Sequence, residues 1–203
     1  MELGIVLVWL GLYLALGVLA LPFASLLFSM TPDRGAGLAI PTAFAAIALF
    51  SYWIGQVQFG VLTALLAVLG LALFSGVALR RGVTIDTSRY RQAAIVFTLA
   101  YLLLILIRLY RPGAVPGGGE KFLDFGLLAS LLRGSVLPPQ DMWFAGEPVQ
   151  YYYGGHMLAA VFAMLTDTAP RFAYNTALAG YFAAYVTAAW GLAGTLASEL
   201  DRP

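Results

Sequence analysis

Residues suited to chemistry gather in one polar stretch, between residues 113 and 156. Four of the ten acidic residues lie there with the only lysine and the only histidine of the chain: Glu120, Lys121, Asp124, Asp141, Glu147 and His156. Carboxylates can act as general bases or hold divalent cations. A connection of this length is uncommon unless it has a function. The stretch is therefore the first place to look for a site.

The first part of the stretch predicts a short helix that lies flat at the membrane surface. Apolar residues recur at helical spacing on one face: Phe122, Phe125, Leu128 or Ala129, and Leu132. Glu120 and Asp124 stand one turn apart, so their carboxylates share a face. Two interpretations are open. The two acids act in a reaction, or Lys121 pairs with Asp124 while Glu120 only favours a helix N-terminus.

An aromatic triplet, Tyr151–Tyr153, closes the stretch. Tyrosine is enriched at membrane interfaces, which is sufficient reason for its presence here. Three consecutive rings on a helix project about 100° apart, so at least one should face protein or a cavity. His156 follows two glycines and is open to the same choice, a hydrogen-bonded interfacial residue or a ligand-binding one.

The elements that must position these residues are membrane-spanning helices. Hydrophobic residues make up 61% of the 203-residue chain and charged residues only 10%, against about 45–50% and about 25% in ordinary globular domains. A chain without cysteine has no thiol nucleophile and no thiolate metal site. A single histidine disfavours a multi-histidine metal centre, and a net charge of +1 with scattered arginines gives no case for nucleic acid.

We expect an all-α, multi-pass protein of the cell membrane, with the lipid bilayer as its solvent and about six spans. The apolar segments lie at about residues 3–28, 38–55, 59–79, 93–110, 155–166 and 172–197. Residues 80–92 carry four arginines against one aspartate, and such loops stay in the cytoplasm. The N-terminus and the 111–155 loop are then extracytoplasmic, and the turn at 167–171 is cytoplasmic.

One transmembrane domain, residues 1–203, is expected. Residues 1–92 hold three spans and the basic loop, and residues 93–203 hold the polar stretch.

Three blocks in this second region resemble a known family. They are Glu120-Lys121-x-x-Asp124, Pro138-Pro139-x-Asp141-x-Trp143-x-x-Gly146 and Tyr151-Tyr152-Tyr153-x-Gly155. Together they resemble the uncharacterised archaeal and chloroflexal YYY family of membrane proteins, also called DUF2298. The resemblance covers about residues 93–190, and Met142 stands where the family favours proline.

The family's layout is similar to that of GT-C glycosyltransferases, which transfer a sugar from a polyprenyl-phosphate carrier at the outer membrane face. The resemblance implies that Asp124 or Glu120 is the general base. Arg108 or Lys121 would offset charge on the leaving phosphate, and Asp141 with Glu120 would hold a divalent cation, Mg²⁺ or Mn²⁺, the only cofactor it suggests. The remaining substrate contacts would come from Trp143, Tyr151, Tyr152, Tyr153 and His156.

Members of that family are several times longer. The 203-residue chain is therefore expected to be inactive alone, and three alternatives are open: a fragment that lacks a C-terminal portion, a subunit that needs a second membrane subunit, or a degenerate copy. The alternative is a non-catalytic scaffold or assembly subunit, in which Trp143 and the tyrosines anchor another protein.

Overall fold

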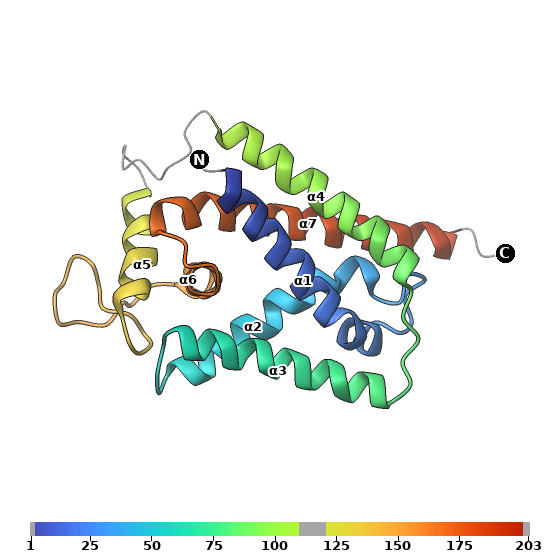
Figure 1. The fold of residues 1–203 in the computed structure, drawn as a ribbon, viewed down its shortest axis with the longest axis horizontal. Coiled ribbons are helices and arrows are strands. Elements are labelled where there is room, and N and C mark those ends of the chain that lie inside the picture. Colours follow the sequence, from blue (N-terminus) through green and yellow to red (C-terminus); the bar gives the residue numbers. More distant parts are fainter. Residues whose placement is uncertain (1–2, 110–120, 201–203) are drawn as a thin grey trace. The chain divides into compact units, whose positions relative to one another are not determined.

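The computed structural model describes residues 3–109 and 121–200, and these residues form helices and connecting loops (Figure 1). The α-helices and one 3₁₀ helix, in chain order, are α1 (Leu3–Leu27), η1 (Ala36–Leu38), α2 (Ala39–Gly55), α3 (Val61–Arg80), α4 (Thr87–Arg108), α5 (Lys121–Arg133), α6 (Gly154–Leu165) and α7 (Pro170–Leu200). The expected all-α helical membrane fold is confirmed.

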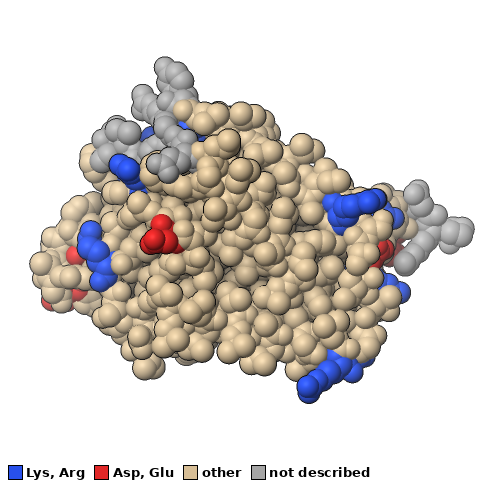
Figure 2. All heavy atoms as spheres, in the orientation of Figure 1, with Lys and Arg blue, Asp and Glu red and all other residues tan. Residues whose placement is uncertain are grey.

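Five helical segments are long and apolar enough to cross a membrane: α1, η1 with α2, α3, α4 and α7. Their exposed apolar side chains, such as Leu73 and Leu103, suit contact with lipid tails. Charged groups interrupt the surface at only a few places in the view of Figure 2. In the described part of the chain the number of such spans is therefore five, rather than about six.

The difference lies in α6, which the sequence analysis took as the fifth span. It has 12 residues, about 18 Å at 1.5 Å per residue, against a hydrocarbon core of about 30 Å. Helix α5, Lys121–Arg133, confirms that a short helix begins the polar stretch, and its position at the membrane surface stays a prediction. Hydropathy alone treats a short buried helix and a short span alike, which is why α6 was counted as a span.

Local signals explain where several helices begin and end. The Asp86 carboxylate accepts the backbone N–H of Arg89 at 2.9 Å, so it caps the start of α4. Helix α3 is followed by Gly82 in the left-handed region, with φ of 72°. Pro170 occupies the first position of α7, where the missing N–H costs nothing.

The chain forms two compact units, and each combines segments from both sides of residue 92. Unit 1 contains Met1–Trp9, Ala46–Gly70 and Ile105–Leu178, and unit 2 contains Leu10–Ala45, Leu71–Leu104 and Ala179–Pro203. The core of unit 2 is aromatic. The ring of Tyr13, fully buried, lies 5.1 Å from that of Phe44 and 5.8 Å from that of Phe97, measured between centroids.

Unit 1 is built around α6, whose residues Met157–Ala163 are all buried, and α5 packs against it. The turn that follows α6 is tied to the first helix, because Trp9 Nε1 donates to Thr168 Oγ1 at 2.9 Å. The sequence analysis assigned this turn and the N-terminus to opposite sides of the membrane. The structure joins the two segments in one compact unit. The side of the membrane on which each lies stays a prediction.

The loop between α5 and α6 is pinned to the α2–α3 turn. Phe59 N donates to Ser135 O at 2.7 Å, and Leu137 N donates to Gly55 O at 2.8 Å. These backbone bonds hold the polar stretch of the sequence in a defined place within unit 1.

Candidate functional site

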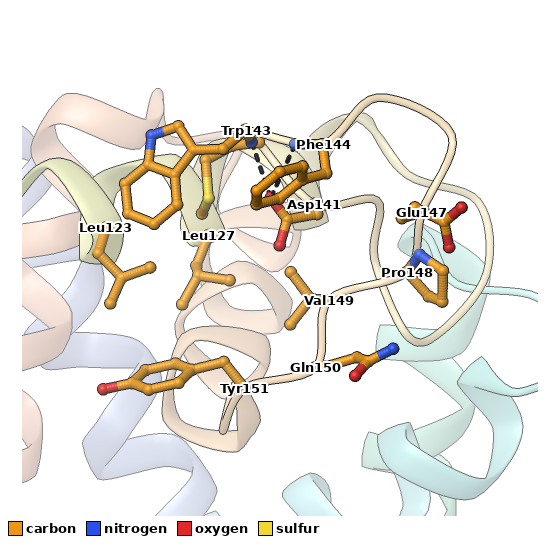
Figure 3. Close-up of a pocket in the computed structure, with 11 residues that line it drawn as sticks. Leu123, Leu127, Asp141, Trp143, Phe144, Glu147, Pro148, Val149, Gln150 and Tyr151 are labelled. Atoms are coloured by element: carbon orange, nitrogen blue, oxygen red, sulfur yellow. Dashed lines mark hydrogen bonds between the residues drawn. The ribbon is translucent and has the colours of Figure 1, made fainter.

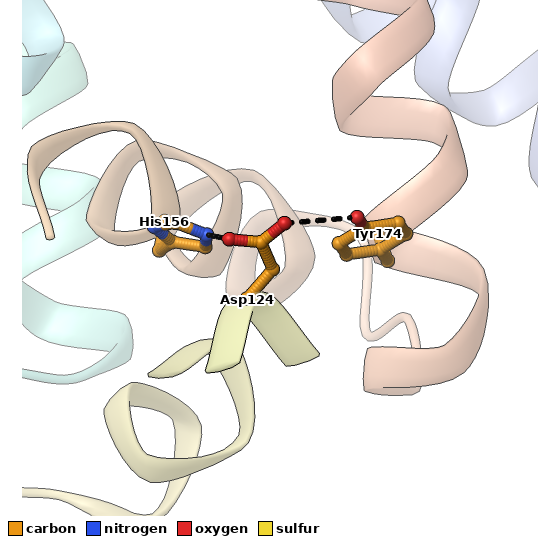
Figure 4. A network of polar contacts seen from close by, with 3 residues as sticks. All are labelled: Asp124, His156 and Tyr174. Carbon is orange, nitrogen blue, oxygen red and sulfur yellow. Dashed lines mark hydrogen bonds and ion pairs between the residues drawn. The ribbon is translucent and has the colours of Figure 1, made fainter. Parts of the chain in front are cut away.

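Asp124 lies at the centre of a polar network that joins three helices of unit 1 (Figure 4). Its Oδ1 lies 3.2 Å from Nε2 of His156 on α6. Its Oδ2 accepts a hydrogen bond from the hydroxyl of Tyr174 on α7, also at 3.2 Å. The Asp124 side chain is 29% exposed and that of His156 is 18% exposed. Solvent or a ligand can therefore reach the carboxylate.

The buried face of α5 brings Asp124 to this position. Leu127, Leu128 and Leu131 are almost completely buried. They stand three, four and seven residues after Asp124, so they share its helix face. Packing this face against the rest of unit 1 carries the carboxylate to α6 and α7.

The expected apolar face of α5 is only partly right. Leu128 is buried as expected, but Phe122 is 52% exposed and Leu127 and Leu131 take its place in the core. Helix α5 is apolar around most of its circumference, so periodicity could not select a single face. Among the described residues, the partners of Asp124 are His156 and Tyr174 rather than Lys121.

The environment of His156 favours its neutral form. Burial lowers the pKa of His156, and the Asp124 carboxylate opposes this shift only in part. Nδ1 is buried without a hydrogen-bond partner among the described residues. A neutral imidazole has one N–H, and the carboxylate is the acceptor at hand. We therefore assign the proton to Nε2, which donates it to Asp124.

A cation lies beside this network. Arg108, at the end of α4, donates from Nε to Oδ1 of Asn175 at 2.8 Å. Asn175 is fully buried and directly follows Tyr174 on α7. Within residues 3–109 and 121–200, no carboxylate forms an ion pair with Arg108. Arginine is well suited to bind phosphate, because its guanidinium offers several N–H donors in one plane.

Asp141 braces a loop. Its Oδ1 accepts the backbone N–H groups of Trp143 at 2.7 Å and Phe144 at 3.1 Å. The described residues contain no group of three or more His, Cys, Asp or Glu that could hold a metal ion. Glu120, the second expected ligand and alternative base, lies outside the described residues. The cation site at Asp141 and Glu120 stays a prediction.

A cavity of about 460 Å³ lies between α5 and this loop (Figure 3). Its lining combines apolar and aromatic side chains with two carboxylates and an amide: Leu123, Leu127, Asp141, Met142, Trp143, Phe144, Glu147, Pro148, Val149, Gln150 and Tyr151. Leu123 and Leu127 flank Asp124 in the sequence, so the cavity and the carboxylate adjoin the same helix. The volume is in the range of small-molecule sites.

The three tyrosines point to different surroundings. Tyr151 lines the cavity, and its ring centroid lies 4.0 Å from that of Tyr152. Tyr152 is 69% exposed. Burial and the nearby Tyr52 raise the pKa of Tyr153, and a hydrogen bond with Gln56 opposes the shift. The triplet precedes α6, which begins at Gly154, so its rings are not arranged by the helical spacing that the sequence analysis assumed.

Sequence reasoning missed Tyr174 and Asn175, which bring Asp124 and Arg108 to α7. A signal was present. Tyr174-Asn175-Thr176 is a run of polar residues inside an apolar span, and polar groups in such positions often mark a site.

A family model with the description "Uncharacterized membrane protein (DUF2298)" matches residues 46–203. No curated protein matches the chain, and no solved structure does. The matched region includes α3 to α7, the network around Asp124 and the cavity. Because it covers well over half of the sequence, the chain belongs to the DUF2298 family of uncharacterised membrane proteins.

Proposed function

We propose that this integral membrane protein is the sugar-transferring module of a GT-C-like glycosyltransferase, with Asp124 as the general base. The observation that carries the proposal is the partly exposed Asp124 carboxylate, held by His156 and Tyr174 beside the Arg108–Asn175 pair. The donor would be a polyprenyl-phosphate sugar at the outer membrane face.

The reaction requires a base and a cation. The acceptor hydroxyl attacks the anomeric carbon of the sugar, and its proton passes to the Asp124 carboxylate. The bond from the anomeric carbon to the phosphate oxygen breaks, and its electron pair leaves with the carrier phosphate. Water then removes the proton from Asp124, whose side chain is 29% exposed. Every atom and charge is accounted for without a redox partner.

Geometry favours Asp124 over His156 as the base. The nitrogen of His156 that faces away from Asp124 is Nδ1, which is buried, so an acceptor hydroxyl cannot approach it. His156 and Tyr174 are positioning residues in this scheme. Each donates to one oxygen of Asp124 and leaves that oxygen a further lone pair for the incoming proton.

Arg108 is the better supported cation for the leaving phosphate. The bond from its Nε to buried Asn175 holds the guanidinium plane beside the network, while the remaining N–H groups stay available for oxygen ligands. Lys121 begins α5, three residues before Asp124, and is the alternative. No step of the scheme depends on a divalent cation.

The test is transfer in membranes of the source organism, where any further subunit is present. A polyprenyl-phosphate-linked radiolabelled hexose, either glucose or mannose, is supplied as donor. We expect Asp124→Asn to abolish label transfer while the chain still inserts. Asp86→Asn, a change in the cap of α4, is the matched control and should retain transfer. Unchanged transfer in Asp124→Asn would remove Asp124 from the mechanism.

A second candidate is a non-catalytic assembly subunit. The observation that favours it is the exposure of aromatic side chains on one loop, because Trp143 and Phe144 are 63% and 68% exposed. Under this alternative, Trp143→Ala would release a co-purifying membrane protein, and Asp124→Asn would have no effect on either assembly or transfer.

A further inference from the structure

The cavity between α5 and the following loop has walls of two kinds. In Figure 3, the rings of Trp143 and Tyr151 lie near Leu123 and Leu127, while Glu147 and Gln150 lie farther along the loop. Broad apolar faces suit a flat ring, and a carboxylate with an amide offers donors and acceptors for hydroxyl groups.

The charge of the lining selects against a phosphate. Glu147 and Asp141 are acidic, and no lysine or arginine is among the described residues that line the cavity. The charge of Asp141 is partly offset by the two backbone N–H groups that its Oδ1 accepts. Glu147 has no such bond among the described residues, so it repels an anion and is ready to accept a hydroxyl. A neutral, hydroxylated ligand is therefore favoured.

Backbone hydrogen bonds order the loop that forms the cavity wall without any bound ligand. Asp141 N donates to Glu147 O at 2.8 Å, and Val149 N donates to Pro139 O at 2.9 Å. The cross-connection, completed by a bridge between Gln140 and Pro148, holds the aromatic and polar walls opposite α5. A site whose walls are already ordered loses less entropy when a ligand binds.

We propose that this cavity binds a neutral saccharide, the acceptor side of the transfer, and that the phosphate of the donor is held elsewhere, at Arg108. The inference rests on the proposed function for the identity of the ligand as acceptor. The binding itself depends only on the cavity: Trp143 and Tyr151 contact the ring faces, and Glu147 and Gln150 bind the hydroxyls.

The experiment uses the full chain purified in a polyoxyethylene detergent, whose head group is neither a sugar nor a choline. Glucose, mannose and their β-linked disaccharides are titrated against tryptophan fluorescence, with isothermal calorimetry as a second readout. The affinity for glucose 1-phosphate shows whether the cavity disfavours a phosphate. The affinity for tetramethylammonium shows whether it prefers a cation to a neutral sugar. We expect glucose 1-phosphate to bind at least tenfold more weakly than the best neutral sugar.

Variants assign the binding to this cavity. Glu147→Gln should lower the affinity for neutral sugars about tenfold, the cost of one hydrogen bond to a charged acceptor. It should also reduce the difference in affinity between glucose and glucose 1-phosphate. Asp167→Asn is the matched control, since Asp167 is an exposed acid of unit 1 outside the cavity and asparagine tolerates its φ of 48°. Trp143→Ala should abolish calorimetric binding.

Three results would overturn the inference: no binding of any neutral sugar, equal binding of glucose 1-phosphate, or tighter binding of tetramethylammonium. The outcome is separable from that of the transfer test. If the chain binds sugars but Asp124→Asn still transfers label, only the proposed base is refuted. If Asp124→Asn abolishes transfer but the chain binds no sugar, only the proposal that this cavity binds a saccharide is refuted.

Discussion

At the scale of single residues, the state of His156 links folding to pH. Its pKa is lowered in the folded chain, so the unfolded chain binds the proton first, at about pH 6.5. The stability associated with neutral His156 is complete above that pH and is lost as the pH falls below it. Protonation would place an N–H on buried Nδ1, where the described residues supply no acceptor.

We therefore predict that His156→Gln reduces the pH dependence of stability between pH 7 and pH 5. Glutamine retains an N–H for Asp124 but does not titrate. The measurement is the unfolding free energy from SDS titration in mixed micelles at each pH. Parallel curves for both proteins would show that His156 does not titrate in this range.

Tyr174→Phe tests the other bond to Asp124. Removal of the hydroxyl deletes the 3.2 Å hydrogen bond and should cost about 1 kcal/mol of unfolding free energy. Tyr185→Phe is the matched control on the same helix, because Tyr185 is 74% exposed. Equal losses in both variants would contradict a specific role for the Tyr174 hydroxyl.

Sequence reasoning found part of the site. Asp124 and His156 were named because acids and a lone histidine stand out in an apolar chain, and Arg108 was named through the family resemblance. The pairing of Asp124 with His156 was not foreseen, because the two are 32 positions apart and meet only when α5 packs on α6. Local spacing offered only Lys121 as a partner for Asp124, as one of two open interpretations. For Asp141, a short-range turn was a competing use of the carboxylate.

At the scale of helices, small residues on α7 decide how closely its neighbours approach. A Cβ at Gly180 would overlap the buried ring of Tyr13, and both residues belong to unit 2. Gly194, on the same helix, has open space around its Cα. Both glycines lie in the same apolar helix, and only the packed structure distinguishes the two positions.

Gly180→Ala should therefore lower the unfolding free energy by about 1–3 kcal/mol, because the core around Tyr13 must shift to admit a methyl group. Gly194→Ala should leave it unchanged or raise it slightly, since alanine is the better helix former. SDS titration of the two variants side by side checks both. A smaller loss at Gly180 than at Gly194 would contradict the close contact with Tyr13.

At the scale of the whole chain, five spans instead of six change the expected membrane topology. If α6 does not cross the bilayer, we expect the turn at Thr168 on the same side as the start of α1, to which it is hydrogen-bonded. By the positive-inside rule we expect the basic α3–α4 loop in the cytoplasm. The number and type of long helices were predictable from hydropathy. Whether a 12-residue helix crosses the bilayer or packs within the protein depends on tertiary contacts, and hydropathy carries no information about them.

Cysteine labelling tests this arrangement, and the chain has no cysteine of its own. Gln150→Cys and Ala169→Cys, both at exposed positions, should react with a membrane-impermeant maleimide in intact cells. Ser88→Cys, in the first turn of α4, should react only after permeabilisation. Labelling of Ala169→Cys only in permeabilised cells would restore the six-span arrangement.

The bond between Trp9 and Thr168 has a consequence for biogenesis. Helix α1 leaves the ribosome long before α6, and it can enter the bilayer as a span of its own. Helix α6 is too short to be released into lipid in the same way. Its Phe162 meets the ring of Trp9 edge-on, 6.2 Å between centroids. We therefore expect the newly made α6 to join the protein by docking on α1 after that helix has been inserted.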